Sequence, residues 1–293
     1  MALNLLGIKA ISLYTNPEHG FVPSVSECKK LITTKTKAIV LVSPNNPTGA
    51  TYPPELIASF ANLASQNGLP LIIDETYRDF LVSGSAPHNL FSPAAAHPWR
   101  STFIHLFSFS KAYCLPGHRL GAIVASPQLL ISIKAILDTL QICPPRPIQL
   151  ALAPLLPTLR PFVKDTANQL HARHALFKSL LPPKWHVGAQ GGYFAFVRHP
   201  FPYVKAEDVS RRLSEEVGIV TLPSSFFSEE KHDDMDLPID QEEETNWSLV
   251  EKEVKVEEGA RWIRFSVANV DDGRVRLVCE RLGGCADVFG WKQ

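Results

Sequence analysis

The feature that most constrains the fold is a series of short apolar runs, each followed by a turn and a helical pattern. Uninterrupted runs occupy residues 37–42 and 69–73, and further strands are expected at 101–107 and 120–125. Runs that lack polar alternation are typical of strands buried on both faces, as in a parallel sheet. The helices between them supply the crossovers that parallel strands require. This order predicts an α/β fold with a mostly parallel sheet.

The pattern changes after residue 127, where helical segments replace the apolar runs. In the later part of the chain, strands are expected at 192–197, 218–222 and 261–267, and helices at 157–181, 206–217 and 275–282. Strands and helices in that order favour a smaller α+β unit. We therefore expect a large domain over residues 1–165 and a small C-terminal domain over 166–293.

The formal charge is zero, but its distribution along the chain is uneven. The sequence has 29 basic and 29 acidic side chains, yet residues 228–258 contain 13 acidic and three basic ones. Such a block is typical of a solvated surface insertion, and a partner-binding role is the alternative. The balanced total gives no basic patch of the kind that binds nucleic acid.

Membrane and secreted classes are disfavoured by the same sequence. No stretch approaches the roughly 18–20 consecutive apolar residues that span a bilayer. The first residues lack a basic segment followed by a long apolar run, which is the pattern of a secretory signal. The five cysteines are scattered and include no CxxC pair, as expected for reduced thiols. We predict a cytoplasmic protein with no nucleic acid or membrane partner.

Polar residues with catalytic potential follow the predicted strands. Asn46 follows the first apolar run, Asp74 follows the second, and Ser108 and Lys111 follow the third. Because ligands of open α/β sheets bind beyond the carboxyl ends of the strands, these residues are candidates for one site. Arg119 lies just before the fourth predicted strand, and the sequence alone does not show that it joins the others.

Each candidate has a chemical interpretation and a structural alternative. A carboxylate such as Asp74 can pair with a protonated ring nitrogen, or it can cap a following helix. A lysine on an apolar turn can lose its proton and attack a carbonyl carbon, whereas a surface lysine stays protonated. The Arg119 guanidinium suits either a phosphate or an ion pair, and Arg264 suits a carboxylate if it points into a cleft rather than outward.

Together these residues resemble the class I/II aminotransferases, which are pyridoxal-phosphate enzymes of fold type I. Four motifs carry the resemblance, and they occur in the order that the family shows. They are SPNNPTG at Ser43–Gly49, DExY at Asp74–Tyr77, SxSKxxxxxGxRxG at Ser108–Gly121, and the late strand Arg261–Ala268. Each motif is weak alone, but the four in this order are specific, and the match covers nearly the whole chain apart from the acidic block.

The resemblance implies a cofactor, pyridoxal 5'-phosphate, and residues that hold its ring. Lys111 would bind the cofactor as a Schiff base and then move the proton between the substrate Cα and C4′ of the cofactor. Asp74 would keep the pyridinium nitrogen protonated, so that the ring accepts electrons. Asn46 and Tyr77 would hydrogen-bond the phenolic oxygen.

The same resemblance implies the rest of the site and its reaction. Ser108, Ser110 and Arg119 would bind the phosphate, and Arg264 would bind the substrate α-carboxylate. The implied protein is a homodimeric transaminase that moves an amino group between an α-amino acid and a 2-oxo acid. The alternatives are β-elimination or a synthase step on the same cofactor, or a catalytically dead dimerising protein. No metal is expected.

The family's large domain also has a part that precedes the position matching Met1. That part includes a phosphate-binding turn at a helix N-terminus and an aromatic residue that stacks on the cofactor ring. Residues 3–7 resemble the last turn of a helix closed by a glycine, and residues 8–14 alternate toward a strand. We therefore expect an N-terminally incomplete sheet with uncovered apolar surface, and a shortened form that binds the cofactor weakly or not at all.

Overall fold

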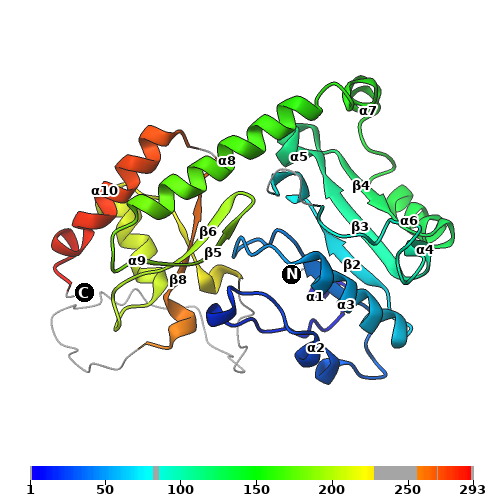
Figure 1. Ribbon diagram of the computed structural model, residues 1–293, viewed down its shortest axis with the longest axis horizontal. Helices are drawn as coiled ribbons and strands as arrows, with labels where there is room; N and C mark the ends of the chain where they lie inside the picture. Colours follow the sequence, from blue (N-terminus) through cyan, green and yellow to red (C-terminus); the bar gives the residue numbers. More distant parts are fainter. Residues whose placement is uncertain (1, 82–85, 228–255, 269, 292–293) are drawn as a thin grey trace, which may run out of the picture.

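The computed structural model describes residues 2–81, 86–227, 256–268 and 270–291. Its strands form two four-stranded sheets, and the long helix α8 (Arg160–Leu180) runs from beside α5, at one end of the first sheet, along the second sheet (Figure 1). The expected boundary at residue 165 falls inside α8, and the division into two domains stays a prediction. The acidic insertion expected at about 228–258 lies almost entirely outside the described residues.

The first sheet has the strand order β1-β2-β3-β4. Strands β1 (Ile39–Val42), β2 (Leu71–Asp74) and β3 (Phe103–Ser108) are parallel, which confirms the mostly parallel α/β sheet. Strand β4 (Gly121–Val124) is antiparallel to β3, a direction that the apolar run did not indicate. Because β4 runs backwards, its first residue lies at the carboxyl end of β3.

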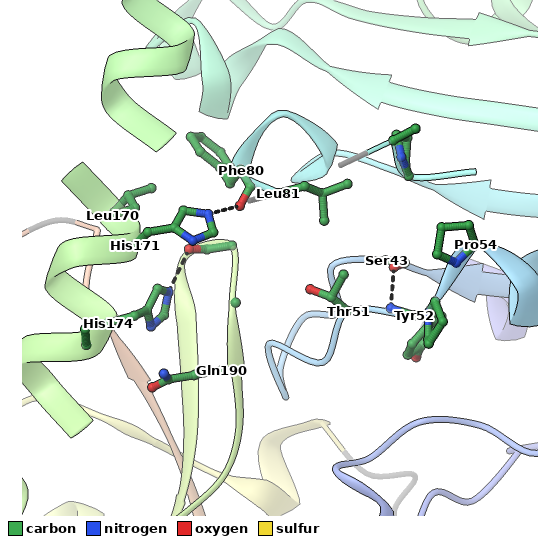
Figure 2. Close-up of a pocket in the computed structure, with 16 residues that line it drawn as sticks. Ser43, Thr51, Tyr52, Pro54, Phe80, Leu81, Leu170, His171, His174 and Gln190 are labelled. Atoms are coloured by element: carbon green, nitrogen blue, oxygen red, sulfur yellow. Dashed lines mark hydrogen bonds between the residues drawn. The ribbon is translucent and has the colours of Figure 1, made fainter. Parts of the chain in front are cut away.

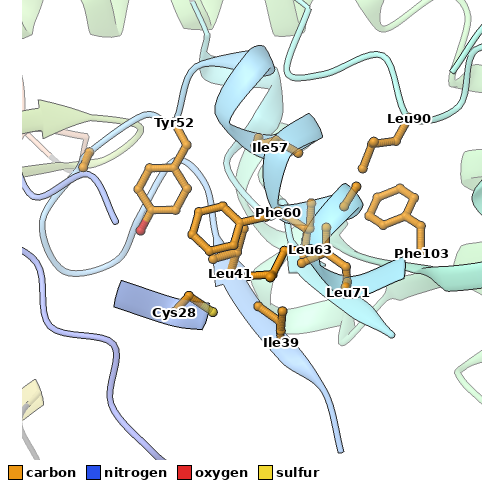
Figure 3. Close-up of a cluster of buried hydrophobic side chains, with 14 of the residues drawn as sticks. Cys28, Ile39, Leu41, Tyr52, Ile57, Phe60, Leu63, Leu71, Leu90 and Phe103 are labelled. Carbon is orange, nitrogen blue, oxygen red and sulfur yellow. The ribbon is translucent and has the colours of Figure 1, made fainter. Parts of the chain in front are cut away.

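Helix α3 (Pro54–Gln66) packs its buried side chains against this sheet and supplies much of the core there. Prolines at its start suit the first turn, and the backbone at Gly68 has a φ of +64°, which only glycine adopts without strain. Figure 3 shows Ile57 and Phe60 of the helix over Leu41 of the sheet. Phe60 is fully buried, so the helix is fixed against the strands that carry the candidate site residues.

The second sheet is antiparallel and has the order β5-β6-β8-β7. Its strands are β5 (His186–Gly191), β6 (Phe194–Arg198), β8 (Trp262–Ser266) and β7 (Leu222–Pro223). Side chains from α8, α9 (Ala206–Arg212) and α10 (Asp272–Phe289) belong to the buried cluster on this sheet. Phe21 also packs on this sheet, with its ring 4.9 Å from that of Trp262. The segment that precedes β1 therefore reaches the second sheet.

Shorter elements connect these layers. They are α1 (Ala2–Leu5), η1 (Pro17–His19), α2 (Val25–Leu31), η2 (Arg78–Phe80), α4 (Trp99–Thr102), α5 (Phe109–Ala112), η3 (Pro116–His118), α6 (Pro127–Leu140), α7 (Arg146–Leu152), η4 (Ala153–Leu155), η5 (Leu213–Val217), η6 (Ser224–Phe227) and η7 (Glu258–Arg261). Within the described ranges, no helix is both long and apolar enough to cross a bilayer.

Two expectations about strands were wrong. No strand forms at residues 8–14, where Ile11 and Tyr14 are exposed and no neighbouring strand supplies a hydrogen-bonding partner. The strand expected at 218–222 is reduced to β7, because Gly218 and Ile219 close the preceding helix instead. Gly218 has a φ of +71°, and the Ile219 N–H donates to the Leu213 carbonyl.

The beginning of the chain agrees with the local prediction. The helical turn α1 is followed by Gly7 with a φ of +66°, as expected for a glycine that ends a helix. Apolar side chains are uncovered on the first sheet and beside it, as expected. Val40 on β1 is 55 % exposed, and Ile131 on α6 is 73 % exposed.

Candidate active site

The topology of the first sheet brings the predicted site residues to one edge. Asp74, the last residue of β2, pairs with Val42 at the end of β1 and with Leu106 on β3. Ser108, the last residue of β3, pairs with Gly121 at the start of the antiparallel β4. The turns after β1, β2 and β3 and the turn before β4 therefore lie at the same edge. This is where ligands bind in open α/β sheets.

Asp74 and Tyr77 belong to the turn that follows β2. The Asp74 carboxylate accepts hydrogen bonds from the Thr76 N–H at 2.9 Å and the Thr76 hydroxyl at 2.7 Å. The carboxylate thus shapes a turn, and the next helical element, η2, begins only at Arg78. Burial raises the pKa of Tyr77 to about 12; the positive charge of Arg264 lowers it and the negative charge of Asp74 raises it. The phenol therefore keeps its proton at neutral pH and can donate a hydrogen bond.

Lys111 lies on α5, a four-residue helix directly after β3. Ser108 caps this helix, since its hydroxyl accepts the Ser110 N–H at 3.3 Å. Ala112, the next residue, is fully buried against Tyr77 and other apolar side chains. The Lys111 side chain is half-buried, and its Nζ lies 5.7 Å from the centre of the Tyr193 ring.

Arg264 connects the second sheet to the turn that follows β1. Its Nη1 donates to the Asn46 Oδ1 at 2.7 Å. Its guanidinium lies between two aromatic rings, 4.4 Å from the centre of Phe194 and 4.6 Å from that of Phe227. Burial lowers the pKa of Arg264, although the nearby Tyr77 raises it. Of the two readings of Arg264 left open above, this geometry favours the inward one.

Arg119 has a different environment from the other candidates. Its backbone has a φ of +52°, its side chain is exposed, and its Nη1 donates to the Pro116 carbonyl at 2.9 Å. The guanidinium is therefore bound to its own turn, although that turn lies beside α5. Binding a phosphate together with Ser108 and Ser110 requires the Arg119 side chain to leave this bond, so the phosphate site stays a prediction.

Comparison with known proteins places these residues in a family. The profile of the family "Aminotransferase class I and II" matches residues 1–282. The chain belongs to this family. Solved aminotransferases have the same fold: a mutant Thermus thermophilus aspartate aminotransferase superposes with a TM-score of 0.77 at 23% identity, over 96% of this chain and 68% of that one. N-succinyldiaminopimelate aminotransferase from Mycobacterium tuberculosis superposes with a TM-score of 0.77 at 22% identity, over 96% and 67%.

Curated relatives of the chain carry several aminotransferase names. Aspartate aminotransferase from Sulfurisphaera tokodaii is 27% identical over 226 residues, which is 74% of this chain and 55% of the relative. Glutamate-pyruvate aminotransferase AlaA from Haemophilus influenzae is 38% identical over 120 residues, which is 41% and 29%. The chain thus spans about half the length of the Sulfurisphaera enzyme.

A buried charged network lies next to Asp74. Glu75 is fully buried, and its Oε2 lies 2.9 Å from His105 Nε2, 3.0 Å from Arg78 Nη1 and 3.3 Å from His88 Nε2. Burial raises the pKa of Glu75, but the close contacts with His105 and His88 and the charge of Arg78 outweigh this effect and lower the pKa to about 2. Sequence reasoning missed this network, because its histidines lie far from Glu75 in the chain.

A cavity of about 540 Å³ lies between α8 and the segment that leads into α3 (Figure 2). His171 and His174 project toward it from α8. The His171 Nε2 forms a hydrogen bond with the Phe80 carbonyl, and the His174 Nε2 forms one with the Gly192 carbonyl. None of the site residues expected from the sequence lines this cavity. Among the described residues, no cluster of three or more histidine, cysteine and carboxylate side chains is arranged to hold a metal ion.

Proposed function

We propose that this chain acts as a pyridoxal-phosphate-dependent aminotransferase that moves an amino group between an α-amino acid and a 2-oxo acid. The observation that carries the proposal is that the turns bearing Asn46, Asp74 and Lys111 lie at one sheet edge, where Arg264 hydrogen-bonds to Asn46. The substrate class comes from the aspartate and glutamate-pyruvate aminotransferases that the chain resembles. The homodimer and the cytoplasmic location stay predictions.

The groups at this edge fit pyridoxal phosphate by their chemistry. The cofactor needs an anion for its ring nitrogen, and the half-buried Asp74 carboxylate is fixed by two hydrogen bonds from Thr76. It needs a donor for its phenolic oxygen, and the buried Tyr77 keeps its proton because its pKa is about 12. It also needs a primary amine, which Lys111 supplies from the same edge. Ser108, Ser110 and Arg119 would hold the phosphate.

When bound, pyridoxal phosphate supplies a protonated ring that accepts electrons from the substrate Cα. Asp74 would hold the proton on the ring nitrogen, and Asn46 and Tyr77 would orient the ring through its phenolic oxygen. Lys111 would hold the cofactor covalently through Nζ, and its amine would carry the proton that leaves the substrate Cα.

Arg264 would hold the substrate carboxylate. A guanidinium can donate two parallel hydrogen bonds to a carboxylate, and the rings of Phe194 and Phe227 keep this one in a defined plane. Its bond to Asn46 places it next to the residue that would bind the cofactor ring. The carboxylate would therefore be held close to Lys111, with the Cα–H bond oriented for proton transfer.

An assay of the two candidate reactions tests the proposal. The chain is incubated with pyridoxal phosphate, L-aspartate or L-alanine, and 2-oxoglutarate, and glutamate is measured alongside ammonia. We expect glutamate to form in step with the 2-oxo acid product, without ammonia. L-Serine, whose β-hydroxyl can leave as water, is incubated in parallel without 2-oxoglutarate. Ammonia and pyruvate formed from serine would indicate β-elimination instead, and no product with any amino acid donor would overturn the proposal for this chain.

Arg264→Lys is expected to weaken substrate binding selectively. Lysine keeps the positive charge but loses the second hydrogen bond to the carboxylate and the planar stacking on both rings. Since these contacts exist before and during the reaction, we expect KM for the amino acid to rise by about tenfold and kcat to change little. Arg211→Lys, on the exposed face of α9, is the control. An unchanged KM in Arg264→Lys would contradict the carboxylate role.

A further inference from the structure

Tyr193 lies in the turn between β5 and β6 and contacts the first sheet. Gly192, directly before it, has a φ of +52°, and a Cβ at that position would lie 3.1 Å from the Cβ of Tyr77. Glycine therefore allows the turn to press against Tyr77. The Tyr193 ring completes this contact, with its centre 5.3 Å from that of Tyr77 and 5.1 Å from that of Phe80.

The Tyr193 hydroxyl reaches the backbone of the lysine helix. Its Oη donates to the Lys111 carbonyl at 3.0 Å, and its ring centre lies 5.7 Å from Lys111 Nζ. Burial raises the pKa of Tyr193 to about 12, with smaller contributions from Cys114 and Tyr77 in the same direction. The hydroxyl therefore keeps its proton and remains a donor across the neutral range.

The helix that carries Lys111 depends on such contacts. Helix α5 has only four residues, too few to be stable by its own hydrogen bonds. The carbonyls in the last turn of a helix lack partners within the helix, and the Lys111 carbonyl instead accepts the Cys114 N–H at 3.2 Å and the Tyr193 hydroxyl. The hydroxyl comes from the second sheet, so it fixes α5 relative to that sheet.

Tyr193 is also tied to the strand that carries Arg264. The Val267 N–H, just beyond the end of β8, donates to the Tyr193 carbonyl at 3.0 Å. One residue thus contacts the Arg264 strand through its backbone and Lys111 through its side chain. Tyr193 therefore links the element that carries Lys111 to the strand that carries Arg264.

We propose that Tyr193 is a positioning residue that sets Lys111 relative to Arg264 through its hydroxyl and ring. The inference rests on the proposed function, in which Lys111 bonds to the cofactor and Arg264 binds the substrate. The residue acts through the backbone of α5 and does not itself touch the reacting atoms. Removing the hydroxyl should loosen α5 and slow the reaction of Lys111, while cofactor affinity stays close to that of the parent chain.

Amide hydrogen exchange of residues 109–114 tests, without any cofactor, whether the hydrogen bond from the Tyr193 hydroxyl stabilises α5. In Tyr193→Phe, which keeps the ring, we expect these amides to exchange about fivefold faster, the change that corresponds to one lost hydrogen bond. Tyr203→Phe is the matched control, because Tyr203 is 51 % exposed. Unchanged exchange at 109–114 in Tyr193→Phe would overturn the proposal.

Reductive labelling measures the consequence for Lys111. The chain is treated with pyridoxal phosphate and cyanoborohydride, and the modified Lys111 peptide is quantified by mass spectrometry across cofactor concentrations. We expect the maximal labelling rate to fall about fivefold in Tyr193→Phe, with an unchanged half-saturating concentration. If Tyr193 had only a structural role, its loss would change the maximal labelling rate and the half-saturating cofactor concentration together.

A donor-restoring variant keeps the test decisive. Replacing Tyr193 with 4-aminophenylalanine restores an N–H donor at the same place and should return both exchange and labelling to near the parent values. Labelling equal to that of Tyr193→Phe would contradict the hydroxyl's role, as would a parent-like rate in Tyr193→Phe. If the parent itself shows no preference for Lys111 over other lysines, the proposed function fails, and the exchange experiment still decides whether Tyr193 fixes α5.

Discussion

Lys111→Ala is expected to abolish labelling at residue 111 and to reduce amino transfer by at least about a thousandfold. Alanine removes the amine that would bond to the cofactor and carry the proton from the substrate. The buried Ala112 and the Ser108 cap anchor α5 without the lysine side chain, so the fold should be retained. The loss is measured with the glutamate assay and by peptide mass spectrometry after borohydride reduction.

Two further variants make the Lys111 result specific. Lys111→Arg keeps the positive charge near Tyr193 but cannot form the bond to the cofactor, so it should be as inactive as alanine. Lys134→Ala removes an exposed lysine on α6 and should behave like the parent chain. Full transfer activity in Lys111→Ala, or labelling centred on another lysine, would show that the reaction does not depend on Lys111.

Local sequence patterns were sufficient to place the strand ends that carry the site. The runs that became β1 and β2 are uninterrupted apolar segments bounded by turns, so their ends could be read from composition alone, although β1 buries one face and leaves Val40 on the other face exposed. Asp74 is the last residue of β2, and Asn46 lies in the turn that follows β1. The antiparallel direction of β4 is indicated less clearly by the sequence than the strand ends are. The link from β3 to β4 is short and has no long helix, whereas a parallel crossover needs one.

The contacts that complete the candidate site could not be derived in this way. Tyr193 and Lys111 are 82 residues apart, and Arg264 and Asn46 are 218 residues apart. Such contacts depend on how the second sheet packs against the first, and no local pattern encodes that. The contact of Phe227 with Arg264 forms within the second sheet and its flanking turn, and the Glu75 network forms within the first sheet, but both join residues that are distant in the sequence. The motif resemblance marked Arg264 as a site residue, but the aromatic rings around it became evident only in the fold.

Glu75→Gln is expected to destabilise the chain by about 3 kcal/mol at pH 7, the free energy that corresponds to a pKa lowered from 4.5 to about 2. Glutamine has nearly the same shape but no negative charge. It leaves the Arg78 guanidinium and the buried His88 and His105 without their shared anion. Because Glu75 directly follows Asp74, the turn that holds Asp74, the proposed partner of the cofactor ring, should loosen as well. Urea unfolding gives the free energy.

The pH dependence of unfolding shows whether the loss of stability in Glu75→Gln comes from the lost negative charge. A carboxylate whose pKa is lowered in the folded state contributes stability above pH 4.5, and this contribution is lost as the pH falls toward 2. The difference between the parent chain and Glu75→Gln should therefore shrink by about 2 kcal/mol between pH 7 and pH 3. Glu27→Gln is the control, because the Glu27–Lys30 pair is exposed and its loss should change stability little. A gap that stays constant with pH would mean that the amide disturbs packing and that the buried charge contributes no stability.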